Sequence, residues 1–197
     1  PMADVHPWYV LMDVSAQGAP GSLNAQFTEA LESAVEKGLV LDAVIAQSSA
    51  QSLNLWRMRE DMAQAQASAG GSIGHDISVP VSKIPEFQRR ADETMEKAYP
   101  GVRHCSFGHV GDGNMHYNPI RPLNWDAARF KAERPKINRI VHDIVMDLGG
   151  SISAEHGIGQ MRQAENVHYK SEVEIDLMRR IKSAFDPIGI LNPGKVL

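Results

Sequence analysis

The sequence predicts an α+β fold in which helices cover one face of an antiparallel sheet. Three observations predict it. Extended and helical patterns alternate along the 197 residues, the connections between them are short, and one Asp-Gly pair separates two extended stretches. Short antiparallel connections favour helices gathered on one side of a sheet over a parallel α/β arrangement. The length is enough for one substantial domain and gives no reason by itself to divide the chain.

The first third of the chain contains two predicted strands and two predicted helices. Apolar runs indicate the strands, whereas a 3.6-residue apolar period, a helix-ending Gly38 and a capping serine at 48 or 49 indicate the helices. The predicted strands are residues 8–14 and 39–46, and the predicted helices are residues 23–36 and 48 or 49 to about 69.

The rest of the chain continues the alternation. Gly-Gly pairs at 70–71 and 149–150 end helices, and Pro135 is expected to kink or split a long one. The predicted strands are residues 73–79, 103–110 and 114–118, with a short extended stretch at 151–154. The predicted helices are residues 83–99, 126–148 and 171–185, followed by an irregular tail at 186–197.

Charge and cysteine content exclude some classes of function. The net charge of −4 gives no basic footprint for nucleic acid, so no nucleic-acid partner is expected. No apolar run approaches the roughly 18 residues that a membrane span needs. Cys105 is the only cysteine, which favours a reducing compartment, and we expect a cytoplasmic location with Cys105 as a small buried apolar residue.

The densest chemistry lies in the segment His109-Val110-Gly111-Asp112-Gly113-Asn114-Met115-His116. If Asp112 and Gly113 form a two-residue hairpin loop, His109 lies directly opposite His116, with Cβ atoms about 4.5–5.5 Å apart. Two imidazoles at that separation can bind one metal ion, and Asn118 would share their face. The alternative is an ordinary cross-strand pair of histidines beside a solvated turn, and the register depends on the turn type.

A third metal ligand and a base can come from the segment Ser153-Ala154-Glu155-His156-Gly157-Ile158-Gly159. Glu155 and His156 are adjacent, so in an extended chain one would face the ion and the other the substrate. Gly157 and Gly159 allow a sharp backbone turn and a close approach to a ligand. The alternative is a glycine-rich loop that starts a helix with a capping glutamate.

Three segments, residues 109–118, 153–159 and 186–195, together resemble the C-terminal domain of FAD-linked oxidases. That family includes D-2-hydroxyglutarate dehydrogenase, D-lactate dehydrogenase and the FAD subunit of glycolate oxidase. The resemblance covers essentially the whole chain, residues 1–197. It implies a ferredoxin-like α+β cap over the flavin, whose C-terminal tail returns to an N-terminal FAD domain that is missing from this chain.

The resemblance also implies roles for individual residues. Metal ligands, for zinc or another divalent ion, are expected at His109, His116 and Glu155. His156 matches the catalytic base, and the substrate contacts are Asn118 and Arg59, the latter in Leu55-Trp56-Arg57-Met58-Arg59-Glu60. FAD contacts are expected at Asn114, Asn192 and Lys195. Arg59 could otherwise be a solvated charge on a helix face. Two positions depart from the hydroxyglutarate pattern, where Ala63 replaces a threonine and Gly74 replaces a lysine.

The implied activity is oxidation of a D-2-hydroxy acid, of the lactate, glycolate or 2-hydroxyglutarate type, to the 2-oxo acid with metal-assisted hydride transfer to FAD. The expected partners are the substrate, an electron-acceptor protein or quinone, the chain's own FAD domain and a second copy in a homodimer. This chain is not expected to turn over alone. The alternative is a non-catalytic, zinc-stabilised binding or scaffolding module, which would need neither His156 nor Arg59 near the metal.

Overall fold

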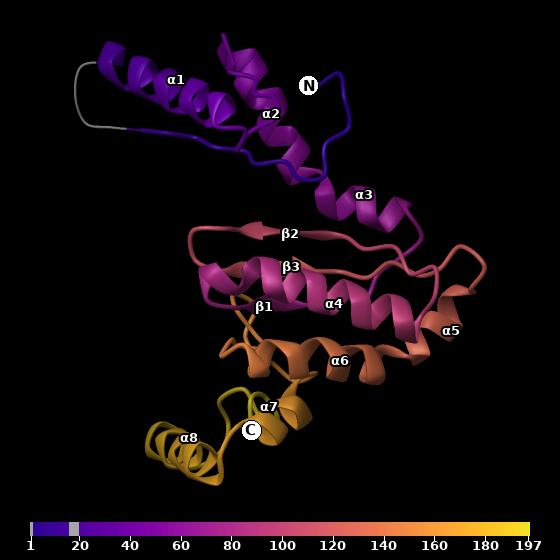
Figure 1. Ribbon diagram of the computed structural model, residues 1–197. Helices are drawn as coiled ribbons and strands as arrows, with labels where there is room; N and C mark the ends of the chain where they lie inside the picture. The colour runs from indigo at the N-terminus through magenta and orange to yellow at the C-terminus, as the bar shows by residue number, and fades with distance from the viewer. Residues whose placement is uncertain (1, 16–19) are drawn as a thin grey trace. The chain divides into compact units, whose positions relative to one another are not determined.

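The computed structural model describes residues 2–15 and 20–197 and divides into two compact units, Pro1–Ala65 and Gln66–Leu197 (Figure 1). The helices of the N-terminal part are α1 (Pro20–Glu36), α2 (Ser49–Glu60) and α3 (Met62–Ser68). The helix predicted at 23–36 therefore forms, whereas the one predicted from 48 or 49 to about 69 is divided at Asp61 into α2 and α3. The side chain of Ser48 accepts a hydrogen bond from the backbone N–H of Gln51 at 3.3 Å, which confirms the predicted serine cap.

Residues 8–14 and 39–46, predicted as strands, are not strands in the structure. Most of their apolar side chains are exposed, with Trp8 at 63% and Leu39 at 77% of full exposure. The prediction was wrong because an apolar run indicates that side chains need a partner surface, whereas a strand also needs a neighbour for its backbone hydrogen bonds. A run of apolar residues does not identify that neighbour.

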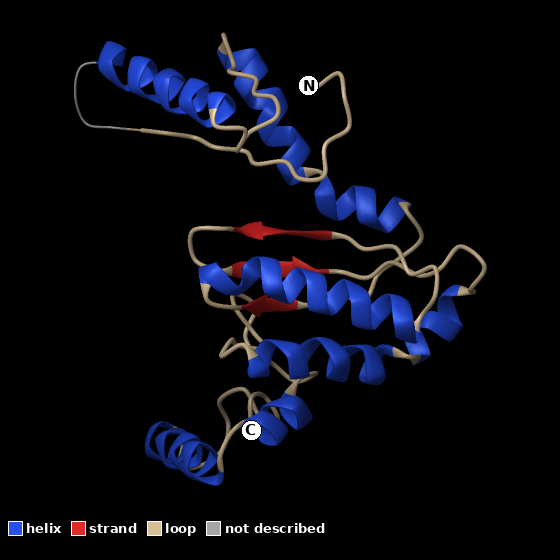
Figure 2. Ribbon diagram, in the orientation of Figure 1, coloured by secondary structure: helices blue, strands red, loops and turns tan. Residues whose placement is uncertain are grey.

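The second unit contains a three-stranded antiparallel sheet with the order β1-β3-β2 (Figure 2). Its strands are β1 (Asp76–Ser78), β2 (Ser106–His109) and β3 (Asn114–Tyr117). Each lies inside a predicted strand but is shorter, and isolated bridges such as Arg103 with Ile120 extend the pairing. The α+β class is confirmed.

Two helices cover one face of this sheet, α4 (Ile84–Ala98) and α6 (Arg134–Asp147) (Figure 1). A 3₁₀ turn, η1 (Val81–Lys83), leads into α4. The core between sheet and helices consists of fully buried side chains, among them Ile77, Tyr117, Phe87, Met95, Ile137 and Val141. Burial of these side chains fixes which face of the sheet is inside and leaves the other face for polar residues.

The predicted long helix at 126–148 is split, as expected from Pro135. A short helix, α5 (Ala127–Ala132), begins at Asp126, whose carboxylate accepts the backbone N–H of Ala128 at 2.7 Å. Helix α6 then starts afresh with Pro135 in its first turn, where a proline has no N–H to leave unsatisfied.

The C-terminal part contains α7 (Gln163–Tyr169) and α8 (Glu172–Phe185), the latter opened by a capping box between Ser171 and Glu174. The tail turns back after α8, and the backbone N–H of Val196 donates to the carbonyl of Gly159 at 2.8 Å. Among the described residues, no helix is long and apolar enough to cross a membrane.

Candidate active site

The face of the sheet opposite α4 and α6 carries a row of polar side chains. Asp76 pairs with His116 and Ser78 pairs with Asn114 across β1 and β3, so these four residues share one face. On the opposite face, Ile77 and its neighbours on β3 are buried in the core. Because side chains alternate along a strand, the core-facing residues determine which polar residues point away from it.

The hairpin between β2 and β3 has a different register from the predicted one. His109 pairs with Asn114, and Phe107 pairs with His116, so the loop holds four residues rather than two. A two-residue type I′ turn needs φ > 0 at both of its central residues, but only Gly113 has it, at 75°, and Asp112 does not. The predicted direct pairing of His109 with His116 was therefore wrong.

The shift nevertheless keeps both histidines on one face, because the register moved by two residues and side chains alternate with a period of two. His109 and His116 are now diagonal neighbours, for which Cβ atoms lie about 7–8 Å apart or somewhat less. That distance is too great for direct contact but leaves room for a group between the two rings.

Glu155 occupies the position between the two histidines. One carboxylate oxygen lies 3.6 Å from Nδ1 of His109, and the other lies 3.6 Å from Nε2 of His116. The carboxylate comes from the loop after Ser151, whose backbone pairs with Ser78 at the end of β1. Glu155 thus lies close to each of the two histidines with which it was predicted to bind a metal ion, although among the described residues only Asp76, Glu155 and His156 have ligand atoms that all lie within 4.8 Å of one another.

Burial, the largest influence, lowers the pKa of His116 below its usual 6.5, and the neighbouring His156 and His109 act in the same direction. The carboxylates of Asp76 and Glu155 oppose this effect without reversing it. An imidazole ring that is neutral near pH 7 has a lone pair available for a metal ion. Two imidazole nitrogens and one carboxylate are donors that suit zinc and similar ions.

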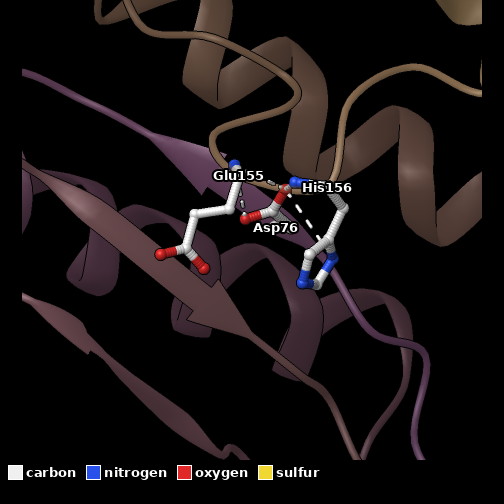
Figure 3. Close-up of side chains that lie close together, drawn as sticks. All are labelled: Asp76, Glu155 and His156. Atoms are coloured by element: carbon white, nitrogen blue, oxygen red, sulfur yellow. Dashed lines mark hydrogen bonds and ion pairs between the residues drawn. The ribbon is translucent and has the colours of Figure 1, made fainter.

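His156 lies beside this trio and is open to solvent. Its side chain is 65% exposed, and its ring centroid is 5.7 Å from that of His116. Glu155 and His156 follow one another in the chain, yet their side chains leave the loop in different directions (Figure 3). The predicted base is therefore next to the predicted ligands and accessible to a small molecule.

Asp76 was not predicted as a site residue, although it lies at the centre of this arrangement (Figure 3). Its side chain is buried, and Oδ2 accepts the backbone N–H groups of Ala154, Glu155 and His156 at 3.2, 3.0 and 2.8 Å. Burial raises the pKa of Asp76, but the hydrogen bonds from the loop outweigh it and hold the pKa below the usual 3.8. A charged residue in the middle of a predicted strand was the only signal that the sequence offered, and it does not specify a role.

Asn114 is buried on the same face, and neither atom of its amide has a hydrogen-bond partner among the residues the structure describes. It borders a pocket of about 220 Å³. The other lining residues are Ser78, Asp112, Ser153, Ala154 and Glu155. A buried amide without partners is unusual in a folded protein and is consistent with a ligand contact at this position.

Comparison with known proteins places the chain in a family. The family model for FAD linked oxidases, C-terminal domain, matches residues 1–196. This chain belongs to that family. The resemblance predicted from the three motifs is thereby confirmed.

Curated relatives match the FAD-linked oxidase C-terminal domain over almost all of its length. A D-2-hydroxyglutarate dehydrogenase of Stutzerimonas stutzeri is 38% identical, with 96% of this chain and 40% of the relative covered. A mitochondrial D-2-hydroxyglutarate dehydrogenase of Arabidopsis thaliana is 35% identical, with 100% and 34% covered. The D-2-hydroxyglutarate–pyruvate transhydrogenase DLD3 of Saccharomyces cerevisiae is 30% identical, with 100% and 40% covered. The chain spans about two fifths or less of the length of these relatives.

The remaining predicted contacts of this FAD-linked oxidase domain are Asn118, Asn192, Lys195 and Arg59. Asn118 is buried, its Oδ1 accepts the backbone N–H of His75 at 3.0 Å, and its Nδ2 donates to Gln66 at 3.1 Å. Asn192 and Lys195 lie in the C-terminal tail, where Nζ of Lys195 is 3.4 Å from the side-chain oxygen of Gln160. Arg59 lies in the last turn of α2, in the first unit, and its role stays a prediction.

Proposed function

We propose that this chain is the substrate-side domain of a flavin-dependent dehydrogenase that oxidises a D-2-hydroxy acid to the corresponding 2-oxo acid. The observation that carries this function is the carboxylate of Glu155 between the rings of His109 and His116, each 3.6 Å away. The exposed ring of His156 lies directly beside it. Together they would provide a metal-binding trio and an adjacent proton acceptor.

His109, His116 and Glu155 would hold the divalent ion, which we propose to be zinc. Three protein ligands leave a position for substrate, as in catalytic rather than structural zinc sites. The partial exposure of His109 and Glu155, at 41% and 46%, supports an open site. A purely scaffolding zinc module would close its fourth position with a protein ligand and would not place an exposed imidazole beside the ion.

Besides holding the ion, the chain's own residues perform two tasks in this reaction. His156 accepts the proton of the substrate hydroxyl, because an imidazole can take up a proton near neutral pH. Arg59 binds the substrate carboxylate with its planar fork, and this contact aims the Cα–H bond. When bound, the ion would supply positive charge that favours loss of the hydroxyl proton, and the flavin would supply the hydride acceptor. The substrate thus loses one proton and one hydride and becomes a 2-oxo acid.

FAD would be held mainly by a domain outside this chain, to which the C-terminal tail would return. Asn114, Asn192 and Lys195 are the proposed contacts of this chain with the cofactor. The buried amide of Asn114, which lacks partners among the described residues and faces a pocket, supports the first of these. An electron-acceptor protein or quinone, a homodimer and a cytoplasmic location stay predictions.

The names of the relatives support the proposed substrate class, because several are D-2-hydroxyglutarate dehydrogenases. Within that class, Ala63 and Gly74 lack the hydroxyl and ammonium groups that would bind a second carboxylate. Lactate and glycolate therefore stand beside 2-hydroxyglutarate as candidate substrates.

The test is activity of the flavoprotein that contains this chain against a panel of D- and L-2-hydroxy acids, using an artificial electron acceptor. We expect turnover with D-acids, loss of turnover after chelation, and recovery on addition of zinc. Turnover that is unchanged by complete removal of the metal would exclude the metal-assisted mechanism. A chain that binds zinc tightly but gives no turnover with any 2-hydroxy acid would favour the scaffolding module.

A further inference from the structure

We propose that Asp76 is a positioning residue whose buried carboxylate fixes the direction of both Glu155 and His156. This role rests on the function proposed above, because it concerns the same metal trio and the same base. Asp76 would touch neither the ion nor the substrate. It would act through the backbone of residues 154–156.

The contacts of Asp76 are those of a backbone anchor. Three consecutive N–H groups, from Ala154, Glu155 and His156, converge on one carboxylate at 2.8–3.2 Å. The backbone carbonyl of Asp76 also accepts the N–H of Ala154, at 3.3 Å. Convergent amides of this kind form a concave anion site, and a buried carboxylate is stable only when it has such partners. The loop and the carboxylate therefore hold each other in one arrangement.

The anchor sets two side-chain directions at once. The carboxylate of Glu155 points toward the two histidines, whereas the ring of His156 lies on the other side of Asp76 (Figure 3). Asp76 is paired directly with His116 across β1 and β3. The loop is thus held by the immediate cross-strand neighbour of a metal ligand, and a displacement of the loop would separate Glu155 from that ligand.

A competing role for Asp76 is that of a metal ligand. Ligand atoms of Asp76, Glu155 and His156 lie within 4.8 Å of one another, which is close enough for a common ion. However, the carboxylate of Asp76 already accepts three N–H groups, and Nη1 of Arg162 lies 3.9 Å away. Loss of those hydrogen bonds would leave the buried carboxylate of Asp76 without its partners, so the anchor role is favoured.

The experiment compares the unsubstituted 197-residue chain with Asp76→Asn, which keeps the shape of the side chain but removes its charge and one acceptor oxygen. Co²⁺ is titrated and followed by its visible absorption, which reports the ligand geometry. Hydrogen exchange of the 154–156 amides is measured without metal. We expect Co²⁺ to bind about 10- to 100-fold more weakly, with an altered spectrum, as is typical for partners of metal ligands. We expect faster exchange at 154–156.

Asp186→Asn is the matched control. Asp186 is also buried, and its carboxylate likewise accepts two backbone N–H groups, from Ile190 and Leu191 at 2.9 Å. This variant loses an equivalent loop anchor and should keep the Co²⁺ affinity and spectrum. If Asp76→Asn fails to fold, Asp76→Glu keeps the charge but displaces it, and should show the same changes in smaller size.

The outcomes distinguish failure of the proposed metal site from failure of the proposed role of Asp76. If the unsubstituted chain binds no Co²⁺, the proposed metal site is wrong, and the exchange of the 154–156 amides still decides whether Asp76 is the anchor. If Co²⁺ binds and Asp76→Asn leaves affinity, spectrum and amide exchange unchanged, the anchor role is wrong. If Asp76→Asn abolishes Co²⁺ binding without changing amide exchange, Asp76 is a ligand instead, which also overturns the anchor role.

Discussion

Asp76 and His116 lie directly opposite one another on β1 and β3, and the carboxylate of Glu155 is 3.6 Å from Nε2 of that histidine. This cross-strand pair therefore contains Asp76, the proposed anchor of the 154–156 loop, and His116, which the side chain of Glu155 approaches from that loop. A change at this pair is expected to alter the metal trio and the base together.

Removal of the charge of Glu155 should weaken metal binding most directly. In Glu155→Gln the two histidines lose the carboxylate that lies between them, and we expect zinc to bind more than about 100-fold more weakly, beyond the effect of an indirect partner. Isothermal titration with zinc measures this, with Glu172→Gln on the exposed first turn of α8 as the control. Equal affinity in Glu155→Gln and the control would exclude Glu155 as a ligand.

Replacement of His156 should affect turnover far more than metal affinity. If His156 accepts the hydroxyl proton, His156→Ala in the complete flavoprotein should lower kcat by about 10²- to 10⁴-fold, while zinc affinity changes little. Steady-state kinetics with the best D-2-hydroxy acid measure the effect. His168→Ala, at an exposed position of α7, is the control. Full turnover in His156→Ala would mean that another group is the base.

Replacement of Arg59 should act on substrate binding. A charge-assisted, bidentate hydrogen-bonding contact with a carboxylate contributes about 1.5–3 kcal/mol to binding. Arg59→Ala should therefore raise KM by roughly 10- to 100-fold. Arg59→Lys should recover only part of this, because an ammonium group lacks the planar fork. Arg57→Ala changes a neighbouring charge of the same helix and should leave KM near its original value. If both alanine variants behave alike, Arg59 has no special role.

The sequence predicted the shared face of the two histidines better than their register. Alternation along a strand determines which face His109 and His116 occupy, and this survives any even shift. The length of the turn depends on the backbone angles of Asp112, where a short polar side chain permits φ > 0 without requiring it. The pattern could therefore place both residues in one site but could not decide which residue lies opposite which.

Asp76 could not be assigned a role from the sequence, because its partners are main-chain N–H groups 78–80 residues away in the chain. Every residue but proline has the same backbone N–H group, so the residue types in the sequence do not indicate which N–H groups bind Asp76. The longer helices were easier to predict, since their apolar period and caps are local, whereas the short helix α7 was not predicted. Residues 8–14 and 39–46 are the opposite case. Their apolar pattern is also local, but it does not show whether a neighbouring strand is available for their backbone hydrogen bonds, and neither segment is a strand.

Gly113 should be the least replaceable residue of the hairpin loop. It has a φ of 75°, and a Cβ there would lie 2.0 Å from the backbone carbonyl oxygen of Val79. Gly113→Ala should therefore lower the free energy of unfolding by about 2 kcal/mol or more. Gly111→Ala is the matched control, because a Cβ at Gly111 meets open space. Urea unfolding compares the two variants, and equal stability would contradict the observed close approach.

The buried His75 should make stability depend on pH. Burial, helped by His142 and Arg162, lowers the pKa of His75 from 6.5 to about 3. Between these values the unfolded chain binds a proton that the folded chain does not, so stability is complete above about pH 6.5 and falls as pH decreases. Each pH unit in that window costs about 1.4 kcal/mol from this group.

Urea unfolding between pH 4.5 and 6.5 tests this dependence, in a window that lies above the usual pKa of most carboxyl groups. The original chain should lose about 2–3 kcal/mol across the window from His75 alone. His75→Phe should be less stable at pH 7, because the hydrogen bond to the carbonyl of Tyr117 is lost, but its slope should be shallower. Some slope should remain from His142, whose pKa burial also lowers. An unchanged slope in His75→Phe would show that His75 titrates normally in the folded protein.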